Sequence, residues 1–223
     1  MKNKKYFITG LILICVFAVW TIMIQTVDVK LIGQGETKTG FASFNLWFHT
    51  ITGVNMILYY ITDWFGLVPI FCCFTFGITG LIQLIKRKNL FKVDTDIIIS
   101  GIYYIVIILL YLFFEMIPIN YRPVLIDGML ETSYPSSTTL LVLSVMPTVS
   151  FLTNRRLTNE YFRTVINISV ILFSVFMIIG RTLSGVHWIT DIIGAVLLSA
   201  GLFLIYKWII LFTNERRLNR GIQ

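Results

Sequence analysis

The sequence predicts an all-α integral membrane protein, a six-transmembrane-helix bundle with an amphipathic interfacial helix between helices 1 and 2. Two observations support this prediction. Of the 223 residues, 57% are hydrophobic and only 13% are charged, which is too apolar a balance for a soluble domain. Apolar runs of about 20 residues, long enough to cross a bilayer as helices, also recur along the chain. The chain has no internal repeat and no low-complexity linker, so residues 1–223 are expected to form a single domain.

Six apolar runs define the expected spans. The first covers about residues 6–27, and since no cleavage site of small residues follows it, we interpret it as a retained helix and not as a signal peptide. The other spans cover about residues 64–85, 97–117, 136–152, 161–179 and 188–212. Basic clusters or a proline end most of these runs, as expected where a helix leaves the membrane.

The basic residues predict how the bundle is oriented. The larger group, on one side of the membrane, comprises Lys2, Lys4, Lys5, Lys86, Arg87, Lys88, Lys92, Arg155, Arg156, Arg163, Lys207, Arg216, Arg217 and Arg220. The other side has Lys30, Lys38, Arg122 and Arg181. The positive-inside rule places the larger group and both termini in the cytoplasm. We therefore expect a multi-pass protein of the cell membrane, with the lipid bilayer and not nucleic acid as the partner of its basic residues.

Residues 28–63, between the first two spans, predict the interfacial helix. Their apolar members recur at helical spacing, and the polar members take other positions. The apolar set is Phe41, Phe44, Trp47, Phe48, Ile51, Val54 and Leu58. The polar set is Ser43, Asn45, Thr50 and Asn55. Such a helix is expected to lie in the outer interface with its aromatic residues as anchors, and His49 is interpreted as a polar-face residue rather than a ligand.

The stretch "GRTLSGVHWITD" contains the first candidate catalytic residues. His187 and Asp191 are four residues apart, so they share one face if the sixth span begins near His187. A carboxylate beside an imidazole fixes its tautomer and stabilises its cation, which leaves the other nitrogen free to act as base or nucleophile. Arg181 precedes His187 by six residues, and Ser184 and Gly185 allow the chain to turn back between them.

The stretches "NYRP" and "SYPSSTT" contain the second group. Arg122 follows the third span, and Pro123 and Pro135 stiffen the loop around it. Ser136 or Ser137 is expected to cap the fourth span. A helix N-terminus has free N–H groups and a positive dipole end, which together form a site for an anion.

Each of these residues alone also fits a structural role, such as an arginine that snorkels to headgroups or a serine that caps a helix. The joint pattern favours phosphate, because guanidinium groups bind phosphate oxygens bidentately and ionisable residues at membrane depth mark functional sites. A histidine nucleophile would then form a covalent intermediate. The sequence has no dense carboxylate cluster, and Cys15, Cys72 and Cys73 lie in apolar runs, so we expect no metal and no other cofactor.

Taken together, the residues resemble the PAP2 superfamily of type 2 phosphatidic acid phosphatases. The family pattern is K-x6-R-P, P-S-x-H and S-R-x5-H-x3-D, and the chain has "EMIPINYRP", "PSST" and "GRTLSGVHWITD". The resemblance covers essentially the whole chain, and its third motif is the most specific. It implies that His187 is the phosphate-accepting nucleophile and Asp191 its orienting partner. It also implies that Arg122, Arg181 and Ser136 bind phosphate.

Three positions depart from the family pattern. Glu115 stands where the family has lysine, and Gly180 stands where it has serine. Thr138 stands where the family has the histidine that protonates the leaving group. Ser137 and Thr138 still offer hydroxyls to a phosphate, but a threonine does not donate a proton at neutral pH.

This departure leaves three alternatives open. In the first, the substrate is a diphosphate, whose phosphate leaving group has a second pKa near ~6 and needs little help. In the second, another acid replaces the histidine, namely Glu131, Asp127 or Glu115, since a lipid alkoxide without a proton donor would lose about 10²–10⁴-fold in rate. In the third, the chain has kept the fold and lost turnover.

The expected function is that of a metal-independent lipid phosphatase active on the extracytoplasmic side of the membrane. Its substrate would be a lipid phosphate or a prenyl diphosphate such as undecaprenyl diphosphate, hydrolysed through a phosphohistidine intermediate. Two alternatives remain. One is a catalytically impaired PAP2-like membrane protein that binds lipid phosphates, and the other is a lipid phosphotransferase in which a second hydroxyl replaces water.

Overall fold

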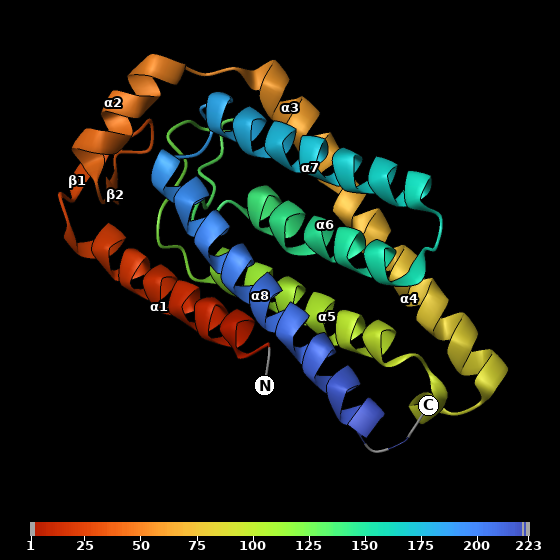
Figure 1. The fold of residues 1–223 in the computed structure, drawn as a ribbon. Helices are drawn as coiled ribbons and strands as arrows, with labels where there is room; N and C mark the ends of the chain where they lie inside the picture. The colour runs from red at the N-terminus through yellow and green to blue at the C-terminus, as the bar shows by residue number, and fades with distance from the viewer. Residues whose placement is uncertain (1–2, 220, 222–223) are drawn as a thin grey trace.

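The computed structural model describes residues 3–219 and 221, and it is built almost entirely of helices (Figure 1). In chain order the elements are α1 (Lys4–Thr26), β1 (Lys30–Ile32), β2 (Thr37–Thr39), α2 (Ala42–Thr52), α3 (Met56–Phe65), α4 (Leu67–Arg87), the short 3-10 helix η1 (Leu90–Lys92), α5 (Thr95–Met116), α6 (Ser137–Arg156), α7 (Glu160–Leu183) and α8 (Ile189–Asn219). Within the described residues, six stretches are long and apolar enough to cross a membrane. The predicted all-α membrane bundle is therefore confirmed.

The second span differs most from its expected bounds. Helices α3 and α4 follow one another through Gly66, whose backbone is itself helical (φ −58°, ψ −18°). The apolar stretch consequently begins at Met56 and not near residue 64. Hydropathy missed this start because Asp63 interrupts the apolar run. The other five spans begin within two residues of the expected positions.

Helix α8 lies at the centre of the bundle, where it packs along α1 on one side and α6 on the other, and α6 packs in turn against α7 (Figure 1). Two glycines allow α1 and α8 to approach closely. A Cβ on Gly10 would lie 2.9 Å from the carbonyl oxygen of Gly201. Small residues at a crossing are the usual way in which membrane helices gain close packing. Asn3 Nδ2 donates to Glu215 Oε1 at 2.6 Å, so α1 begins at the end of the bundle where α8 finishes.

The interior contains tyrosines whose hydroxyls are paired. Tyr206 Oη and Ser100 Oγ are 2.8 Å apart, and Tyr104 Oη and Thr148 Oγ1 are 2.6 Å apart. Because no water solvates such groups at membrane depth, these pairs satisfy hydroxyls that would otherwise be costly to bury. On the outside, large apolar side chains such as Ile57 are exposed (75%), as a lipid-facing surface requires.

The connection between α1 and α3 corrects the expectation of one amphipathic helix that extends to Leu58. It starts with the β1–β2 hairpin, which the apolar pattern did not predict. Helix α2 then ends before Gly53, whose φ of 62° breaks the helix, so Leu58 lies on α3 instead. Helix α2 itself is amphipathic, because Trp47 and Ile51 are exposed (58% and 64%) whereas Asn45 is buried against the bundle.

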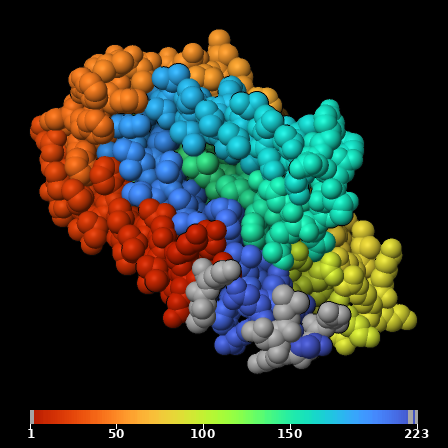
Figure 2. All heavy atoms as spheres, in the orientation of Figure 1, coloured from red at the N-terminus to blue at the C-terminus, as the bar shows by residue number. Residues whose placement is uncertain are grey.

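Two connections meet at the end of the bundle that α2 covers. They are the α5–α6 loop (residues 117–136) and the α7–α8 turn (residues 184–188), and a hydrogen bond from Ser136 N to the Asp191 carbonyl oxygen (3.3 Å) joins them at the start of α6 and α8. In Figure 2, α2 (orange) lies over the region where α7 and α8 (blue) meet. We call this the loop end. It contains most of the residues that the sequence singles out for chemistry.

Candidate active site

The turn between α7 and α8 brings Arg181 and His187 together, as the sequence predicts. Gly185 makes the reversal with a φ of +67°, a conformation that favours glycine. A Cβ at this position would lie 1.9 Å from the carbonyl oxygen of Gly53. The turn therefore passes directly against the α2–α3 connection, and no other residue type fits there.

His187 is held in one tautomer. Its Nδ1 lies 3.2 Å from the Ser133 carbonyl oxygen, which only accepts, so Nδ1 carries the hydrogen. Its Nε2 lies 3.0 Å from Arg181 Nη2, which only donates, so Nε2 presents its lone pair. Burial, followed by the positive charges of Arg122 and Arg181, holds the pKa of His187 well below its usual value of 6.5. The ring is therefore neutral, which is the nucleophilic form of histidine.

Asp191 lies on the same side as His187 but does not accept its proton. Its Oδ2 is 3.9 Å from His187 Nδ1, which is beyond hydrogen-bonding distance. The carboxylate instead accepts from Trp188 N at 3.0 Å and from Asn120 Nδ2 at 3.1 Å. The bond that orients the imidazole thus comes from Ser133, and Asp191 holds the start of α8 next to the ring through Trp188 and Asn120.

Two guanidinium groups from different parts of the chain converge on the ring of Tyr59. The Cζ atom of Arg181 lies 5.0 Å from the ring centroid, and that of Arg122 lies 5.4 Å from it. Both arginines are buried. Arg122 Nη1, Arg181 Nε and Arg181 Nη1 make no hydrogen bond to any part of the chain that the structure describes. Buried donors without acceptors are costly, and the oxygens of a phosphoryl group would satisfy them.

The start of α6 offers backbone donors next to the start of α8, where Ser136 N donates to the Asp191 carbonyl oxygen at 3.3 Å. Ser136 is the N-cap residue, but its side chain makes no cap hydrogen bond. Its Oγ pairs with Thr139 Oγ1 at 3.0 Å instead. The first-turn amides are therefore uncapped by this side chain, and half-buried Ser137 and Thr138 lie in the same turn. Uncapped amides at a helix N-terminus are the donors that the expected anion site would use.

The three carboxylates that were expected as substitute acids take different positions. Glu131 lies at the arginine pair, with its Oε2 3.1 Å from Arg122 Nη2. Glu115, at the end of α5, lines a small cleft that Ser137 also borders. Asp127 is exposed at the tip of the α5–α6 loop, with a φ of 50°. Among the described residues, no ion pair or hydrogen bond links Asp127 to the arginines, so Glu131 and Glu115 are the better placed of the three.

A fourth carboxylate, that of Asp63 on α3, reaches the site although the sequence reasoning missed it. Its Oδ1 lies 3.5 Å from Arg181 Nη1. Thr138 packs at the same place, since a Cβ on Gly66 would lie 3.2 Å from Thr138 Cγ2. A sequence signal existed, because Asp63 is the sole acidic residue in residues 56–87 and an ionisable residue at membrane depth marks a functional site.

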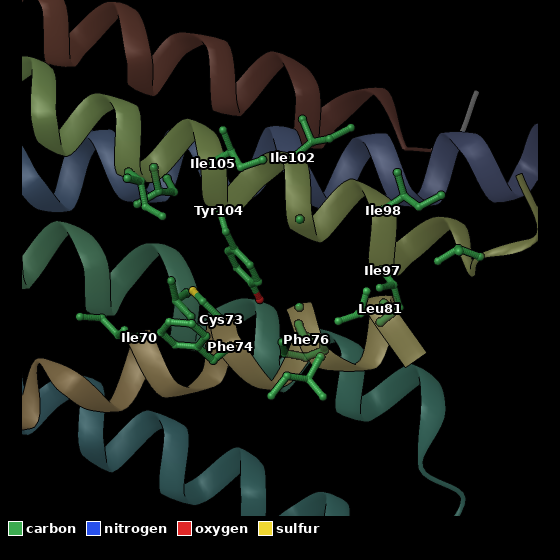
Figure 3. Close-up of a pocket in the computed structure, with 18 of the residues that line it drawn as sticks. Ile70, Cys73, Phe74, Phe76, Leu81, Ile97, Ile98, Ile102, Tyr104 and Ile105 are labelled. Carbon is green, nitrogen blue, oxygen red and sulfur yellow. The ribbon is translucent and has the colours of Figure 1, made fainter. Parts of the chain in front are cut away.

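The described part of the chain offers no candidate metal cluster, and a large groove elsewhere in the bundle is apolar. Residues 3–219 and 221 hold no group of three His, Cys, Asp or Glu side chains placed to bind a metal ion. A groove of about 730 Å³ lies between α4 and α5, with walls that include Ile70, Phe74 and Ile102 (Figure 3). These walls are almost wholly apolar, so the groove does not suit a phosphate group.

Two buried arginines and a histidine therefore meet at one end of a helical membrane bundle, which is an arrangement that suits a phosphate group. The sequence profile of the PAP2 superfamily matches residues 70–215, and the chain belongs to this superfamily. A crystal structure of a transmembrane PAP2-type phosphatidylglycerolphosphate phosphatase from Bacillus subtilis matches the fold with a TM-score of 0.63 and 18% identity, over 89% of this chain and 94% of that chain. No curated protein matches the chain in sequence.

Proposed function

We propose that the protein is a metal-independent lipid phosphatase of the cell membrane that works through a phosphohistidine intermediate. The observation that carries this proposal is the 3.0 Å contact between Arg181 Nη2 and His187 Nε2, in a site where guanidinium N–H groups make no hydrogen bond to the described residues. The substrate is a lipid phosphate or a prenyl diphosphate such as undecaprenyl diphosphate. Phosphatidylglycerolphosphate, the substrate of the Bacillus subtilis relative, represents the monophosphate class.

In the first step, Arg122 and Arg181 bind the phosphoryl oxygens, assisted by Ser136 and the amides at the start of α6. His187 Nε2 attacks the phosphorus atom in line. The N–P bond forms while the bond from phosphorus to the leaving oxygen breaks, and the electron pair leaves with that oxygen. The phosphorylated ring keeps its Nδ1 hydrogen and is cationic, and the nearby charge of Asp191 stabilises it.

The leaving group decides which substrates react readily. With Thr138 in place of a proton donor, a lipid alkoxide would leave as a strong base. The lipid monophosphate released from a prenyl diphosphate leaves without protonation, because its second pKa is near ~6. We therefore place diphosphates ahead of monophosphates as substrates. Glu131 and Glu115 are the candidate donors if monophosphates react.

The orientation of the bundle determines which side of the membrane the site faces. The excess of Lys and Arg at the end opposite the loop end favours a cytoplasmic position for that end and for both termini. The site then opens to the extracytoplasmic side, where the headgroups of outer-leaflet lipids lie. Water at that side would supply the second step.

Two observations favour the alternative of a lipid-phosphate-binding protein with impaired turnover. Thr138 removes the proton donor of the family pattern, and Arg181 Nη2 already occupies the lone pair of His187 Nε2. A phosphotransferase would use the same phosphohistidine and replace water by the hydroxyl of a second lipid. All three functions bind a phosphorylated lipid at the arginine pair.

The deciding experiment is phosphate release by the purified protein from an undecaprenyl diphosphate and from phosphatidylglycerolphosphate, measured beside His187→Ala. We expect release from the diphosphate by the wild type and none above background by the variant. Faster release from the diphosphate than from the monophosphate would support the leaving-group argument. Equal release by wild type and variant would refute the enzyme proposal, and transfer of phosphate to an added lipid alcohol would support the phosphotransferase.

A further inference from the structure

We propose that Asp63 is the general base that activates water for hydrolysis of the phosphohistidine, an inference that rests on the function proposed above. Asp63 and His187 lie at the two terminal nitrogens of one guanidinium. Arg181 Nη1 lies 3.5 Å from Asp63 Oδ1, and Arg181 Nη2 lies 3.0 Å from His187 Nε2. A phosphoryl group held by Arg181 on His187 would therefore lie next to the carboxylate.

The exposure of Arg181, His187 and Asp63 fits their proposed roles as phosphate ligand, nucleophile and base. Arg181 and His187 are buried, whereas 54% of the Asp63 side chain is exposed. Asp63 thus lies at the outer edge of the site, beside the buried arginine. The rest of the chain leaves room next to its carboxylate for the water molecule that the proposed hydrolysis requires.

The position of Asp63 within an apolar stretch of the sequence also indicates a functional role. It is the sole acidic residue in residues 56–87 and is followed directly by Trp64 and Phe65. A carboxylate in an apolar span is costly unless it is paired. The partner that it has is Arg181, the arginine that contacts the proposed nucleophile, and not a basic residue elsewhere on the surface.

Because Thr138 stands where the family has a histidine, hydrolysis lacks its usual proton acceptor, and Asp63 can take that role. The group that protonates the leaving oxygen in the first step ordinarily deprotonates water in the second, by microscopic reversibility. A diphosphate substrate removes the need for the acid, but the attacking water must still lose a proton. Thr138 cannot accept it. Gly66, three residues after Asp63, packs against Thr138, so the backbone that carries Asp63 passes close to the position of the missing group.

Glu131 is the competing carboxylate, and the contacts favour Asp63. Glu131 pairs with Arg122 at 3.1 Å, and within the described residues Arg122 makes no hydrogen bond to His187. Asp63 pairs with the arginine that does contact His187. Its carboxylate is therefore the one that forms an ion pair with the same guanidinium that hydrogen bonds to the nitrogen that would carry the phosphoryl group.

Asp63 takes part in the second chemical step, the hydrolysis of the phosphohistidine. The oxygen of water attacks phosphorus, the bond between phosphorus and His187 Nε2 breaks, and its electron pair returns to Nε2. One proton of the water passes to the Asp63 carboxylate and then to solvent. Hydrogen phosphate leaves the arginines, and His187 is again neutral with its hydrogen on Nδ1.

The test is the level of phosphorylated protein during turnover of an undecaprenyl diphosphate labelled with ³²P in its terminal phosphate. The wild type should hold little label in the steady state. Asp63→Asn keeps the shape and loses the base, so it should form the phosphohistidine quickly, retain close to one label per active site, and turn over about 10²–10⁴-fold more slowly. The label should be lost in acid and survive in base, as a phosphohistidine requires. Asp63→Glu should restore turnover in part, which a purely structural role would not predict.

Two control variants and the rates of the two chemical steps separate the possible outcomes. Glu36→Gln removes an exposed carboxylate at the same end of the bundle and should behave as the wild type. Accumulation of label in Glu131→Gln and not in Asp63→Asn would overturn the proposal in favour of Glu131. Equal slowing of phosphorylation and dephosphorylation in Asp63→Asn would show that Asp63 only positions Arg181. Absence of label and of phosphate release in the wild type would instead refute the proposed function itself.

Discussion

At the scale of single residues, burial determines the chemistry available to His187. The ring is almost fully enclosed (4% exposed), and its two nitrogens have partners that allow only one tautomer. Desolvation and the adjacent arginines hold the pKa of His187 well below 6.5. The folded protein therefore keeps this histidine neutral at a pH where an exposed histidine would begin to bind a proton.

The difference in the His187 pKa between the folded and the unfolded chain predicts a loss of stability in acid. The unfolded chain protonates His187 below about pH 6.5 and the folded chain does not, so protons favour the unfolded state as the pH falls below that value. Thermal unfolding in detergent should show a steeper loss of stability for the wild type than for His187→Gln, which has no titrating ring. Parallel curves for the two proteins would contradict the buried neutral imidazole.

The residues of the site differ in how far the sequence could reveal them. The spacing from Arg181 to His187 predicted their approach, and the structure brings them together. The bond that orients the imidazole was unpredictable, because it comes from the backbone carbonyl of Ser133, and every residue has a carbonyl. Tyr59, which both arginines contact, lies in an apolar run where a tyrosine gives no signal of its own. Asp63 had a signal, but it was interpreted as the end of a loop.

At the scale of elements, α2 supports the site from outside the bundle. Asn45 Nδ2 donates to Thr190 Oγ1 at 3.0 Å, and His49 Nε2 donates to the Gly185 carbonyl oxygen at 3.0 Å. The polar face of this interfacial helix thus holds the α7–α8 turn, and its aromatic face points outward. The sequence predicted the amphipathic pattern but not its purpose, since periodicity does not tell which element a polar face will contact.

The tight contact at the α7–α8 turn predicts a strong effect of Gly185→Ala. The left-handed backbone costs an alanine about 1–2 kcal/mol. The Cβ of the alanine would also lie 1.9 Å from the Gly53 carbonyl oxygen, so the turn would have to move. Gly77→Ala is the matched control, because nothing lies within 4 Å of a Cβ there, and an alanine inside a helix should stabilise by about 0.5–1 kcal/mol. Thermal unfolding and phosphate release should both fall for Gly185→Ala alone. Similar behaviour of the two variants would contradict the close packing of the turn.

The hairpin before α2 and the break after it could not be predicted from hydrophobic periodicity. The residues of the β1–β2 hairpin include Lys30 and Lys38 and have no clear apolar alternation. The break at Gly53 depends on a positive φ, which glycine allows but does not require. Hydrophobic periodicity continued to Leu58 and hid the change from α2 to α3.

At the scale of the whole molecule, the six spans and their order were predictable because long apolar runs have few other stable structures. The arrangement around α8 was not, because glycine contacts such as that of Gly10 with Gly201 have the same sequence appearance as glycines that face lipid. Gly77 and Gly101, which have open space around them, illustrate this.

The proposed orientation predicts which end of the molecule faces the outside of the cell. In a background with Cys15, Cys72 and Cys73 replaced by alanine, Asp127→Cys places a thiol at the loop end, and Thr158→Cys places one between α6 and α7 at the opposite end. A membrane-impermeant thiol reagent added to intact cells should label the first and not the second. After the membrane is permeabilised, both should react. The reverse pattern in intact cells would contradict the orientation.

Under the proposed function, the contact between Arg181 and His187 also bears on which phosphate compounds would be substrates. A phosphoryl group must displace the guanidinium from Nε2 before attack, and the apparent affinity falls by the fraction of molecules in which this nitrogen is free. Soluble phosphate esters gain nothing that offsets this loss. A long-chain lipid is already concentrated in the bilayer around the helices, so its occupancy of the site stays high. Discrimination against cellular metabolites would then arise from where the substrate resides rather than from the shape of the site.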